Sequence, residues 1–380
     1  MAKKALIVAN LIGFVNFLWH DFEILRDMGF ELHFAANATI KDFNTDGELQ
    51  ELINKRITFH NIDFDSKTPF SKKNLIAYNQ IKKLVKEHQY RLVHCNTPII
   101  GVFTRMAARN LRLNGTTVIY TTHGFSFTYL SAKKEWWFYY TCEKLLSRYT
   151  DIIITINHDD FKIAQSMYCK NVKYINGVGV DTEKFKSVTV NRNHHREKIG
   201  VGKDDIMILS VGELSTRKNH SIILEALSLL ENKEKYTYVI CGKGIGNLGT
   251  GKYLEELAKE RSIKLRLLGH RSDIPEIIKC SDIGAIPSIR EGLGLAGIES
   301  LSAGVPLVGS DVQGIRDYII NDINGYLCNP FSIEEFAFAI KKLSVKEERQ
   351  RMKENCFRIA KEFDICVSHK QMREIYESVL

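Results

Sequence analysis

Short apolar runs alternate along the chain with longer segments in which apolar residues recur every three or four positions. The first run, Ala5–Ala9, is followed by the breaker Gly13 and by an amphipathic segment, Trp19–Met28. Apolar runs separated by helices of about ten or more residues indicate parallel strands joined by crossover helices. The same pattern predicts strands at Glu31–Ala35, Leu92–His94, Val118–Thr122, Ile152–Ile156, Met207–Val211, Tyr238–Cys241, Lys264–Leu268, Ile283–Pro287 and Pro306–Gly309, and helices at Asn74–Glu87, Pro98–Arg109 and Trp136–Leu146.

The alternation lapses over residues 187–205, which are polar and poor in aromatic side chains. We therefore expect an α/β protein of two doubly wound, Rossmann-like domains with a linker region near 173–205. The first domain would span 1–172 and the second 173–361, and a C-terminal helix over about 362–380 would pack back on the first. Ligands of such sheets bind at the carboxyl ends of the strands, so the cleft between the domains is the expected site.

Composition agrees with this picture. The chain has 380 residues, which suits two domains, and 44% of them are hydrophobic, which excludes disorder as the main state. No run of about 18 apolar residues predicts a transmembrane helix, and the chain start reads as a buried strand rather than a signal peptide. The eight cysteines are scattered without a Cys-x-x-Cys pair. We therefore expect core thiols in a reduced, cytosolic compartment, not a cysteine zinc site or a disulfide framework.

The net charge of +8 is unevenly distributed. Residues 1–175 hold 23 basic and 16 acidic side chains, whereas residues 176–380 hold 30 and 29. Two interpretations stay open: solvated helix faces, or a surface that meets anionic lipid or a lipid diphosphate. Nucleic acid is not an expected partner, because no recognised nucleic-acid module accompanies the charge. The basic excess gathers at Lys72, Lys73, Lys82, Lys83 and Lys86, and at Arg105, Arg109 and Arg112.

Two glycine-containing turns follow predicted strands. In the second domain, Gly246–Lys252 fits the start of a phosphate-binding loop, but Tyr253 stands where that motif needs Ser or Thr to hold magnesium. We therefore predict a surface loop, with its Gly242 end approached by a ligand phosphate. In the first domain, Gly13 lies in a strand-to-helix turn, which is a weaker signal for a binding loop.

The segment EGLGLAGIESLSAGVP, Glu291–Pro306, contains more candidate ligand-binding groups than any other segment considered. Gly292 and Gly294 follow a strand and open a helix, where backbone N–H groups can approach a phosphate at the positive helix end. Glu291 and Glu299 can accept hydrogen bonds from sugar or ribose hydroxyls, which favours a nucleotide-sugar ligand. The spacing alone leaves open a capped helix with solvent-exposed glutamates.

This Glu-x7-Glu segment, followed by SLSAGVPLVGSD, resembles the signature of glycosyltransferase family 4. Members are retaining enzymes of the GT-B architecture, in which two Rossmann-like domains face each other across a cleft. The segments HCNTP, TTHGFSF and NGVGVD are most similar to those of the branch of enzymes that builds bacterial exopolysaccharide, capsule or O-antigen units. Similar segments occur in the family's order over almost the whole chain: LVHCNTPIIGVFTRMAAR, VIYTTHGFSF, DIIITINHDD, INGVGVDTEKF, SVGELSTRKNHSIILEAL, LLGHRSDI and GIRDYIINDINGYL.

The resemblance implies roles for the matching residues of the second domain. Glu299 would bind the ribose hydroxyls, and Glu291 would approach the donor sugar. Lys218, in TRKNH, would neutralise the leaving diphosphate, and Arg271 would lie in the loop near the base. The backbone that cradles the diphosphate would be that of Gly292, Leu293 and Gly294.

Two further positions matter for the expected catalytic centre. His123, in THG of the first domain, matches the histidine that faces the donor sugar. Many family members carry an arginine directly after the glycine of the VG segment, where this chain has Glu213. Arg217 could supply the missing charge to the diphosphate, or it could merely pair with Glu213; the sequence leaves both open.

The resemblance also implies a mechanism. The acceptor would attack on the face that the leaving group departs from, the leaving phosphate would take the acceptor proton, and the configuration would be retained. No cofactor or metal is expected, because no Asp-x-Asp cluster stands at the expected loop.

The expected enzyme transfers a hexose or N-acetylhexosamine from a UDP-sugar to a polyprenyl-diphosphate-linked or growing glycan in bacterial surface polysaccharide synthesis. It would be cytoplasmic and peripheral on the inner face of the membrane, bound through its basic N-terminal half. A UDP-sugar epimerase of the same architecture and a non-catalytic nucleotide-sugar or glycan-binding protein stay open as alternatives.

Overall fold

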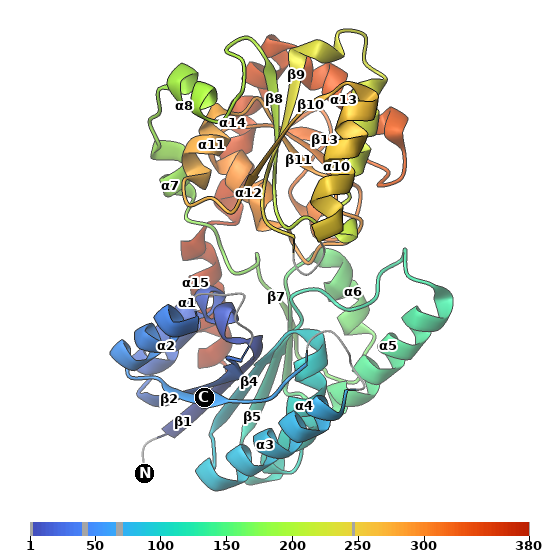
Figure 1. Ribbon diagram of the computed structural model, residues 1–380. Coiled ribbons are helices and arrows are strands. Elements are labelled where there is room, and N and C mark those ends of the chain that lie inside the picture. Colours follow the sequence, from blue (N-terminus) through green and yellow to red (C-terminus); the bar gives the residue numbers. More distant parts are fainter. Residues whose placement is uncertain (1–2, 40–44, 66–70, 245–247, 380) are drawn as a thin grey trace. The chain divides into compact units, whose positions relative to one another are not determined.

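A computed structural model describes residues 3–39, 45–65, 71–244 and 248–379 of the chain. The chain divides into an N-terminal unit, Met1–Val178 with Cys366–Leu380, and a C-terminal unit, Gly179–Ile365. Each unit consists of one parallel sheet with helices packed on it (Figure 1). The prediction of an α/β protein with two doubly wound, Rossmann-like sheets is confirmed.

The sheet of the N-terminal unit has seven described strands, all parallel. Its central strands are buried on both faces, as the runs of β-branched residues predict. In spatial order the strands are β3 (Thr58–Asn61), β2 (Phe30–Asn37), β1 (Lys3–Leu11), β4 (Leu92–Asn96), β5 (Thr117–Thr121), β6 (Ile152–Thr155) and β7 (Val172–Tyr174). The helices are α1 (Trp19–Asp27), α2 (Thr45–Asn54), α3 (Lys72–His88), α4 (Pro98–Ala108), α5 (Lys133–Leu146), α6 (His158–Gln165) and α15 (Ile365–Glu377).

Local sequence sets where several of these helices begin. Pro98 occupies the first turn of α4, where its missing N–H costs nothing, and the side chain of Asn157 caps α6 by accepting from the backbone N–H of Asp160. Helices α3, α4 and α5 cover one face of the sheet, and α1 and α15 cover the other (Figure 1). Helix α15 is held by a hydrogen bond between Tyr376 Oη and His94 Nδ1 of 2.7 Å.

The sheet of the C-terminal unit has six described strands, again all parallel. Helices α9, α10 and α13 cover one face, and α7, α8, α11, α12 and α14 cover the other (Figure 1). In spatial order the strands are β10 (Lys264–Gly269), β9 (Tyr236–Cys241), β8 (Ile206–Val211), β11 (Ile283–Ile286), β12 (Leu307–Ser310) and β13 (Gly325–Cys328). The helices are α7 (Thr182–Ser187), α8 (Arg192–Lys198), α9 (Ser221–Ser228), α10 (Leu248–Arg261), α11 (Ile274–Cys280), α12 (Leu295–Ser302), α13 (Ile333–Ser344) and α14 (Lys346–Glu362).

The region expected to be a linker is folded. Strand β7 pairs with β6, so the first unit extends to Val178 rather than to 172. Helices α7 and α8 then pack on the C-terminal unit, and Arg196 is buried and bonds to the carboxylate of Asp282 and to backbone carbonyls. Most of the other polar side chains of this stretch are exposed on these helices and turns, so its polar composition is that of a folded surface and not of an extended connection.

The expected basic surface of the N-terminal half is smaller than predicted. Arg105 is fully buried, where its Nη2 donates to Glu143 over 2.7 Å and its guanidinium lies over the ring of Tyr120. Arg112 is bound by the carboxylate of Asp151. The prediction that Arg105 adds to a surface patch is therefore wrong, because its charge is paired inside the fold, whereas Arg112 is 26% exposed with its charge paired to Asp151.

Among the described residues, no helix is both long and apolar enough to cross a bilayer.

Candidate functional site

The order of strands in the C-terminal unit reverses between β8 and β11. Strands β9 and β10 continue from β8 on one side, and β12 and β13 continue from β11 on the other. Open α/β sheets bind ligands at the carboxyl ends of their strands at such a switch point. Lys218 ends the 3-10 turn that follows β8 (Thr216–Lys218), and Glu291 follows β11. The switch point thus brings together two residues that are 73 positions apart.

Glu291 binds two cations at this point. Its side chain is only 9% exposed, and its Oε1 accepts hydrogen bonds from Lys218 Nζ at 2.6 Å and Ser288 Oγ at 2.8 Å. The Nη1 of Arg217 lies 3.3 Å from the same oxygen. Burial acts to raise the pKa of Glu291, but the nearby charges of Lys218 and Arg217 outweigh burial and bring the pKa below its ordinary value. Glu291 is therefore a charged carboxylate and not the solvent-exposed residue that the spacing left open.

Two glycines make room for Lys218. A Cβ on Gly212 would lie 3.2 Å from Cε of Lys218, so the lysine stem passes close to the backbone of this loop. A Cβ on Gly242 would lie 1.8 Å from the carbonyl oxygen of Gly212, which no side chain could tolerate. The packing of the β8 and β9 ends accordingly requires glycine at Gly242.

Arg217 is shared between two carboxylates. Its Nη2 donates to Glu213 Oε1 over 3.0 Å, and its Nη1 donates to the carbonyl oxygen of Arg290 over 3.0 Å. The same Nη1 approaches Glu291, as described above. Arg217 therefore pairs with Glu213 and lies beside Glu291, the partner of Lys218.

Helix α12 begins next to this ion-pair cluster. Gly294, its N-cap, has φ of 83°, a left-handed conformation that glycine adopts at little cost, and no side chain caps the helix start. Gly314 approaches the loop so closely that a Cβ on it would lie 2.5 Å from the carbonyl oxygen of Gly292. Leu293 is buried. The loop of Gly292–Gly294 that precedes α12 is thus packed against Gly314. It lies next to the cluster of Glu291, Lys218 and Arg217.

Glu299 lies one helical turn and a half further along α12. Its side chain is partly buried, and its carboxyl oxygens accept no hydrogen bond from the described part of the chain. Burial raises the pKa of Glu299 to about 7, with a small opposing effect from the charge of Lys184. A desolvated carboxyl group without a partner is energetically costly unless a ligand satisfies it.

The other predicted residues of this unit lie further from the cluster. Arg271 follows the edge strand β10, where both arms of its guanidinium bind the carboxylate of Asp273 at 2.8 and 2.6 Å. Gly246, the first residue of the predicted phosphate-loop pattern, lies outside the described residues. Its last residue, Lys252, is 77% exposed and lies 3.6 Å from Glu256 on α10, so the prediction of a surface loop is wrong from Leu248 onward, where the chain is already helical.

His123 of the N-terminal unit follows β5 in a strained backbone conformation, with φ of 50°. Its Nε2 bonds to Asn96 Oδ1 at 2.9 Å, and its ring packs edge-on against Phe14 at 4.9 Å, next to Gly13. Burial lowers the pKa of His123 to about 3, so the imidazole is neutral at physiological pH. Both Gly13 and His123 lie at the carboxyl ends of central strands, and His123 lines a small pocket in this unit.

Three neighbours of these residues were missed by sequence reasoning. Asn96 holds the His123 ring, and its Nδ2 is buried without a partner among the described residues. Asp21 lines the same pocket, and burial raises its pKa to about 7. Tyr318 donates to the carbonyl oxygen of Gly294 and supports the start of α12. Only Asn96 had a local signal, because it ends a strand in the HCNTP segment.

Comparison with known proteins finds glycosyltransferases throughout. The family described as Glycosyl transferases group 1 matches residues 191–358, and Glycosyl transferase 4-like matches residues 25–157. The putative glycosyltransferase EpsD of Bacillus subtilis is 33% identical over 100% of this chain and 98% of its own length. An Escherichia coli protein named UDP-Gal:alpha-D-GlcNAc-diphosphoundecaprenol alpha-1,3-galactosyltransferase is 30% identical over 80% of this chain and 79% of its own.

Solved structures share the fold at lower identity. Anabaena HepE, in complex with UDP and glucose, has a TM-score of 0.79 and 19% identity over 99% of this chain and 100% of its own. WaaG, a glycosyltransferase involved in lipopolysaccharide biosynthesis, has a TM-score of 0.73 and 16% identity over 98% of this chain and 99% of its own. The two Rossmann-like sheets are thus those of the GT-B fold.

Proposed function

Since this chain belongs to the group 1 glycosyltransferases, we propose that it transfers a hexose or N-acetylhexosamine from a UDP-sugar to a lipid-linked or growing glycan, with retention of configuration. The observation that carries the proposal is the cluster of Lys218, Arg217 and Glu291 beside the uncapped start of α12. The E. coli relative, named for UDP-Gal and a diphosphoundecaprenol acceptor, supports the choice of donor and acceptor.

We assign the nucleotide to the C-terminal unit. Glu299 accepts hydrogen bonds from the ribose hydroxyls, which would satisfy its unpartnered carboxyl group. The diphosphate lies against the backbone of Gly292, Leu293 and Gly294, at the positive end of α12. The assignment rests on the resemblance of the Glu-x7-Glu segment to the family motif.

The chemical step develops negative charge on the departing UDP. The C1–O bond to the diphosphate breaks, the acceptor hydroxyl oxygen bonds to C1 on the same face, and its proton passes to a diphosphate oxygen. Lys218 stabilises this negative charge. Arg217 also stabilises it if its guanidinium group turns from Glu213 to the phosphate oxygens. Glu291 holds Lys218 in position before the donor arrives. These cations supply the charge compensation, so the proposed step uses no metal.

His123 is assigned a hydrogen bond to the transferred sugar, as in the family motif. Its pKa of about 3 makes the neutral ring a hydrogen-bonding group and not a proton donor at physiological pH. Asn96 positions the ring through the bond to Nε2.

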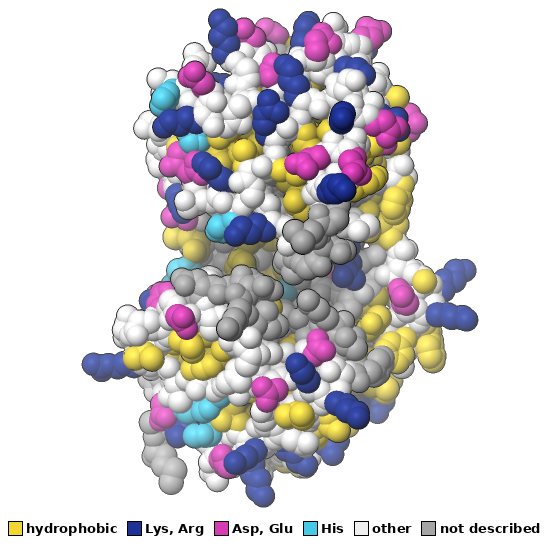
Figure 2. Space-filling view, viewed as in Figure 1, with side chains coloured by type: hydrophobic (Ala, Val, Ile, Leu, Met, Phe, Trp, Pro, Cys, Tyr) yellow, Lys and Arg dark blue, Asp and Glu magenta, His cyan; other side chains and the backbone are white. Residues whose placement is uncertain are grey.

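A membrane surface is the proposed location of the acceptor. Helices α4 and α5 enclose an apolar pocket of about 400 Å³ that includes Phe103 and Phe138. Trp137 is 67% exposed beside it, and Lys133 and Lys134 are exposed at the start of the same helix. Figure 2 shows hydrophobic side chains next to Lys and Arg at the outer edge of the N-terminal unit, where Figure 1 places α5. Apolar and basic side chains together favour an anionic lipid surface.

The experiment that tests the function measures UDP release from a panel of UDP-sugars, with and without polyprenyl-diphosphate-linked acceptors. We expect release that depends on acceptor and a product one sugar longer, with GDP- and ADP-sugars as matched controls. A change of the sugar without acceptor would identify an epimerase instead. Tight UDP-sugar binding without turnover on any acceptor would identify a binding protein.

A further inference from the structure

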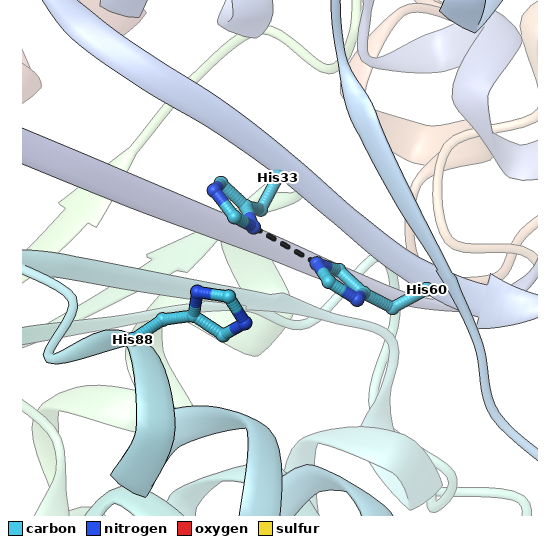
Figure 3. Close-up of side chains that lie close together, drawn as sticks. All are labelled: His33, His60 and His88. Carbon is cyan, nitrogen blue, oxygen red and sulfur yellow. Dashed lines mark hydrogen bonds between the residues drawn. The ribbon is translucent and has the colours of Figure 1, made fainter.

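Three histidines from separate parts of the N-terminal unit gather at one place. His33 comes from β2, His60 from the edge strand β3 and His88 from the last turn of α3 (Figure 3). One ring nitrogen of each lies within 4.8 Å of the others. Within the described parts of the chain, no other group of three His, Cys, Asp or Glu residues has ligand atoms this close.

The rings are arranged for a shared ligand. His33 Nδ1 and His60 Nε2 are 2.8 Å apart, and these two rings are stacked with centroids 5.1 Å apart. The His88 ring lies with its centroid 5.0 Å from that of His33 and 5.6 Å from that of His60. Figure 3 shows His88 on the side of the pair that faces the end of α3. His33 is buried, whereas His60 and His88 are partly exposed, so an ion can enter from solvent.

A carboxylate orients the buried ring. Glu31 Oε1 lies 3.0 Å from His33 Nε2 and accepts a hydrogen bond from its N–H. The other ring nitrogen, Nδ1, then carries the lone pair, which is directed toward His60. Tyr90 Oη donates to the same Nδ1 at 2.9 Å, so this hydroxyl must release Nδ1 before that nitrogen can bind a metal. Histidines that bind metals almost always donate their second ring nitrogen to a carboxylate, carbonyl or water in this way.

We propose that His33 Nδ1, His60 and His88 bind a divalent transition-metal ion, of which Zn²⁺ is the best match. Imidazole suits zinc, and three protein ligands with a water complete a tetrahedral site. Zinc–nitrogen bonds of about 2.0–2.1 Å place tetrahedral ligand nitrogens about 3.4 Å apart. The three nitrogens need only small side-chain rotations to reach that spacing, because all already lie within 4.8 Å.

The position of the site indicates a structural role. Tyr90 lies in the turn that enters β4, whereas Asn96 and His123 lie at the opposite, carboxyl ends of the strands. A bound ion would tie the four-residue edge strand β3 and the end of α3 to β2. The site is therefore separate from the transfer chemistry, and its test does not depend on the proposed function.

The test uses the full chain without a histidine tag, freed of metal by chelation. We expect calorimetry to show one Zn²⁺ bound per chain, and Zn²⁺ in large excess over its dissociation constant to raise Tm by about 5 °C or more. Co²⁺ in the same site should show the intense visible absorption of tetrahedral cobalt. UDP binding, measured in parallel, should be unchanged by Zn²⁺.

Variants identify the ligands. His60→Gln and His88→Gln should each weaken Zn²⁺ binding by about tenfold or more, and Glu31→Ala, which removes the acceptor for His33 Nε2–H, by about tenfold through loss of orientation. His60 and His88 are chosen because neither is fully buried, and a normal Tm without metal verifies folding. The control is His194→Gln, an exposed histidine of the other unit, which should bind as the native chain does. Absence of stoichiometric binding, or full binding by the His60→Gln/His88→Gln double variant, would overturn the proposal.

Discussion

Glu291 shows how one buried carboxylate can hold two cations at the site proposed for the diphosphate. It holds Lys218 at 2.6 Å and Arg217 at 3.3 Å, so both cations are in position without ligand. A preorganised cation stabilises developing charge without reorganisation during the reaction. Glu213 pairs with Arg217 over 3.0 Å, so under the proposed function it competes with the diphosphate for that second charge.

The first prediction concerns these cations. Lys218→Ala should lower kcat by about a hundredfold or more, the scale of losing one preorganised transition-state donor. Steady-state kinetics at saturating donor measures this, and Lys252→Ala, a surface lysine, is the control. Because the variant leaves Glu291 with one partner fewer, its Tm must be checked before kinetics are compared.

Arg217→Ala belongs to the same series. It should also lower kcat if the fork binds phosphate. If Arg217 only offsets Glu213, the Glu213→Gln/Arg217→Ala double variant should recover most of the activity. Near-normal turnover of Arg217→Ala alone would discard the phosphate role.

The second prediction concerns Glu299. Its pKa of about 7 lies above its ordinary value of 4.5, so the folded protein binds the proton more tightly than the unfolded chain does. Folding stability should therefore fall as pH rises from about 4.5 through 7, and Glu299→Gln should remove that fall. At pH 8 the variant should be more stable by about 1–3 kcal/mol, measured by urea unfolding.

The same carboxyl group should make donor binding depend on pH. Ribose hydroxyls favour the ionised form, so the affinity for a UDP-sugar should rise through about pH 7 and level off above it. Glu299→Gln should bind at least about tenfold more weakly at pH 8 and lose this dependence. Calorimetry with an intact UDP-sugar, whose diphosphate does not titrate in this range, avoids the ionisation of free UDP. Unchanged affinity in the folded variant would discard the ribose role.

At the scale of elements, the short helix α12 depends on close packing behind it. A Cβ on Gly297 would lie 2.4 Å from Oη of Tyr318, and Tyr318 is fully buried. That tyrosine also binds the carbonyl oxygen of Gly294, so the helix start and its support are one packed assembly. Small displacements here would move the N–H groups assigned to the diphosphate.

The third prediction follows from this packing. Gly297→Ala should destabilise the chain by about 1–3 kcal/mol, because the added methyl group overpacks a buried contact. Gly251→Ala is the matched control, since a Cβ there would meet its nearest atom at an ordinary 3.5 Å within α10. The control should be neutral or stabilising by up to about 1 kcal/mol. Equal urea midpoints for the two variants would contradict the packing argument.

Element prediction worked best where a strand lies in the middle of its sheet. Strand β6 is buried throughout and was predicted from its β-branched residues, and β5 and β8 were predicted from short apolar runs. Strands β3, β7 and β13 were missed. They are three or four residues long and lie at sheet edges. Strands β3 and β7 are partly exposed and lack an apolar run, whereas β13 is mostly buried but too short to show one.

At the scale of the whole molecule, the proposed chemistry and the proposed histidine site give opposite responses to metal removal. The fourth prediction is that turnover well below Tm survives EDTA, because Lys218 and Arg217 compensate the diphosphate charge. The same treatment should lower Tm if the histidines hold zinc. Loss of turnover that magnesium or manganese restores would show that the phosphate chemistry is wrong.

The fifth prediction concerns the membrane. The full chain should co-sediment with vesicles that contain anionic lipid and should be released by high salt. Salt screens the attraction between exposed charges, whose reach is about 8 Å at physiological ionic strength and shorter at high salt. Lys133→Ala/Lys134→Ala should weaken this binding by about tenfold or more. Lys341→Ala/Lys342→Ala, an exposed pair on α13, makes the same charge change in the other unit and should bind normally. Binding independent of anionic lipid content would remove the proposal.

The sequence by itself determined the fold class and the residues of the Glu-x7-Glu segment. Both can be read from short stretches of sequence. The patterns used are apolar runs, helical periodicity and glycines at the start of a helix, and each involves residues within about ten positions of one another. The resemblance added Lys218 and His123 with roles that geometry has not tested.

Only the tertiary structure decided which distant groups meet. Lys218 and Glu291 come together because β8 and β11 are neighbours in the sheet, although 73 residues separate the two side chains. Arg105 is buried rather than exposed because Glu143, on another helix, neutralises it. His33, His60 and His88 have no common motif and meet through the order of β3 and β2 and the end of α3. Strand order and burial arise from the packing of the whole chain, so no local pattern contains them.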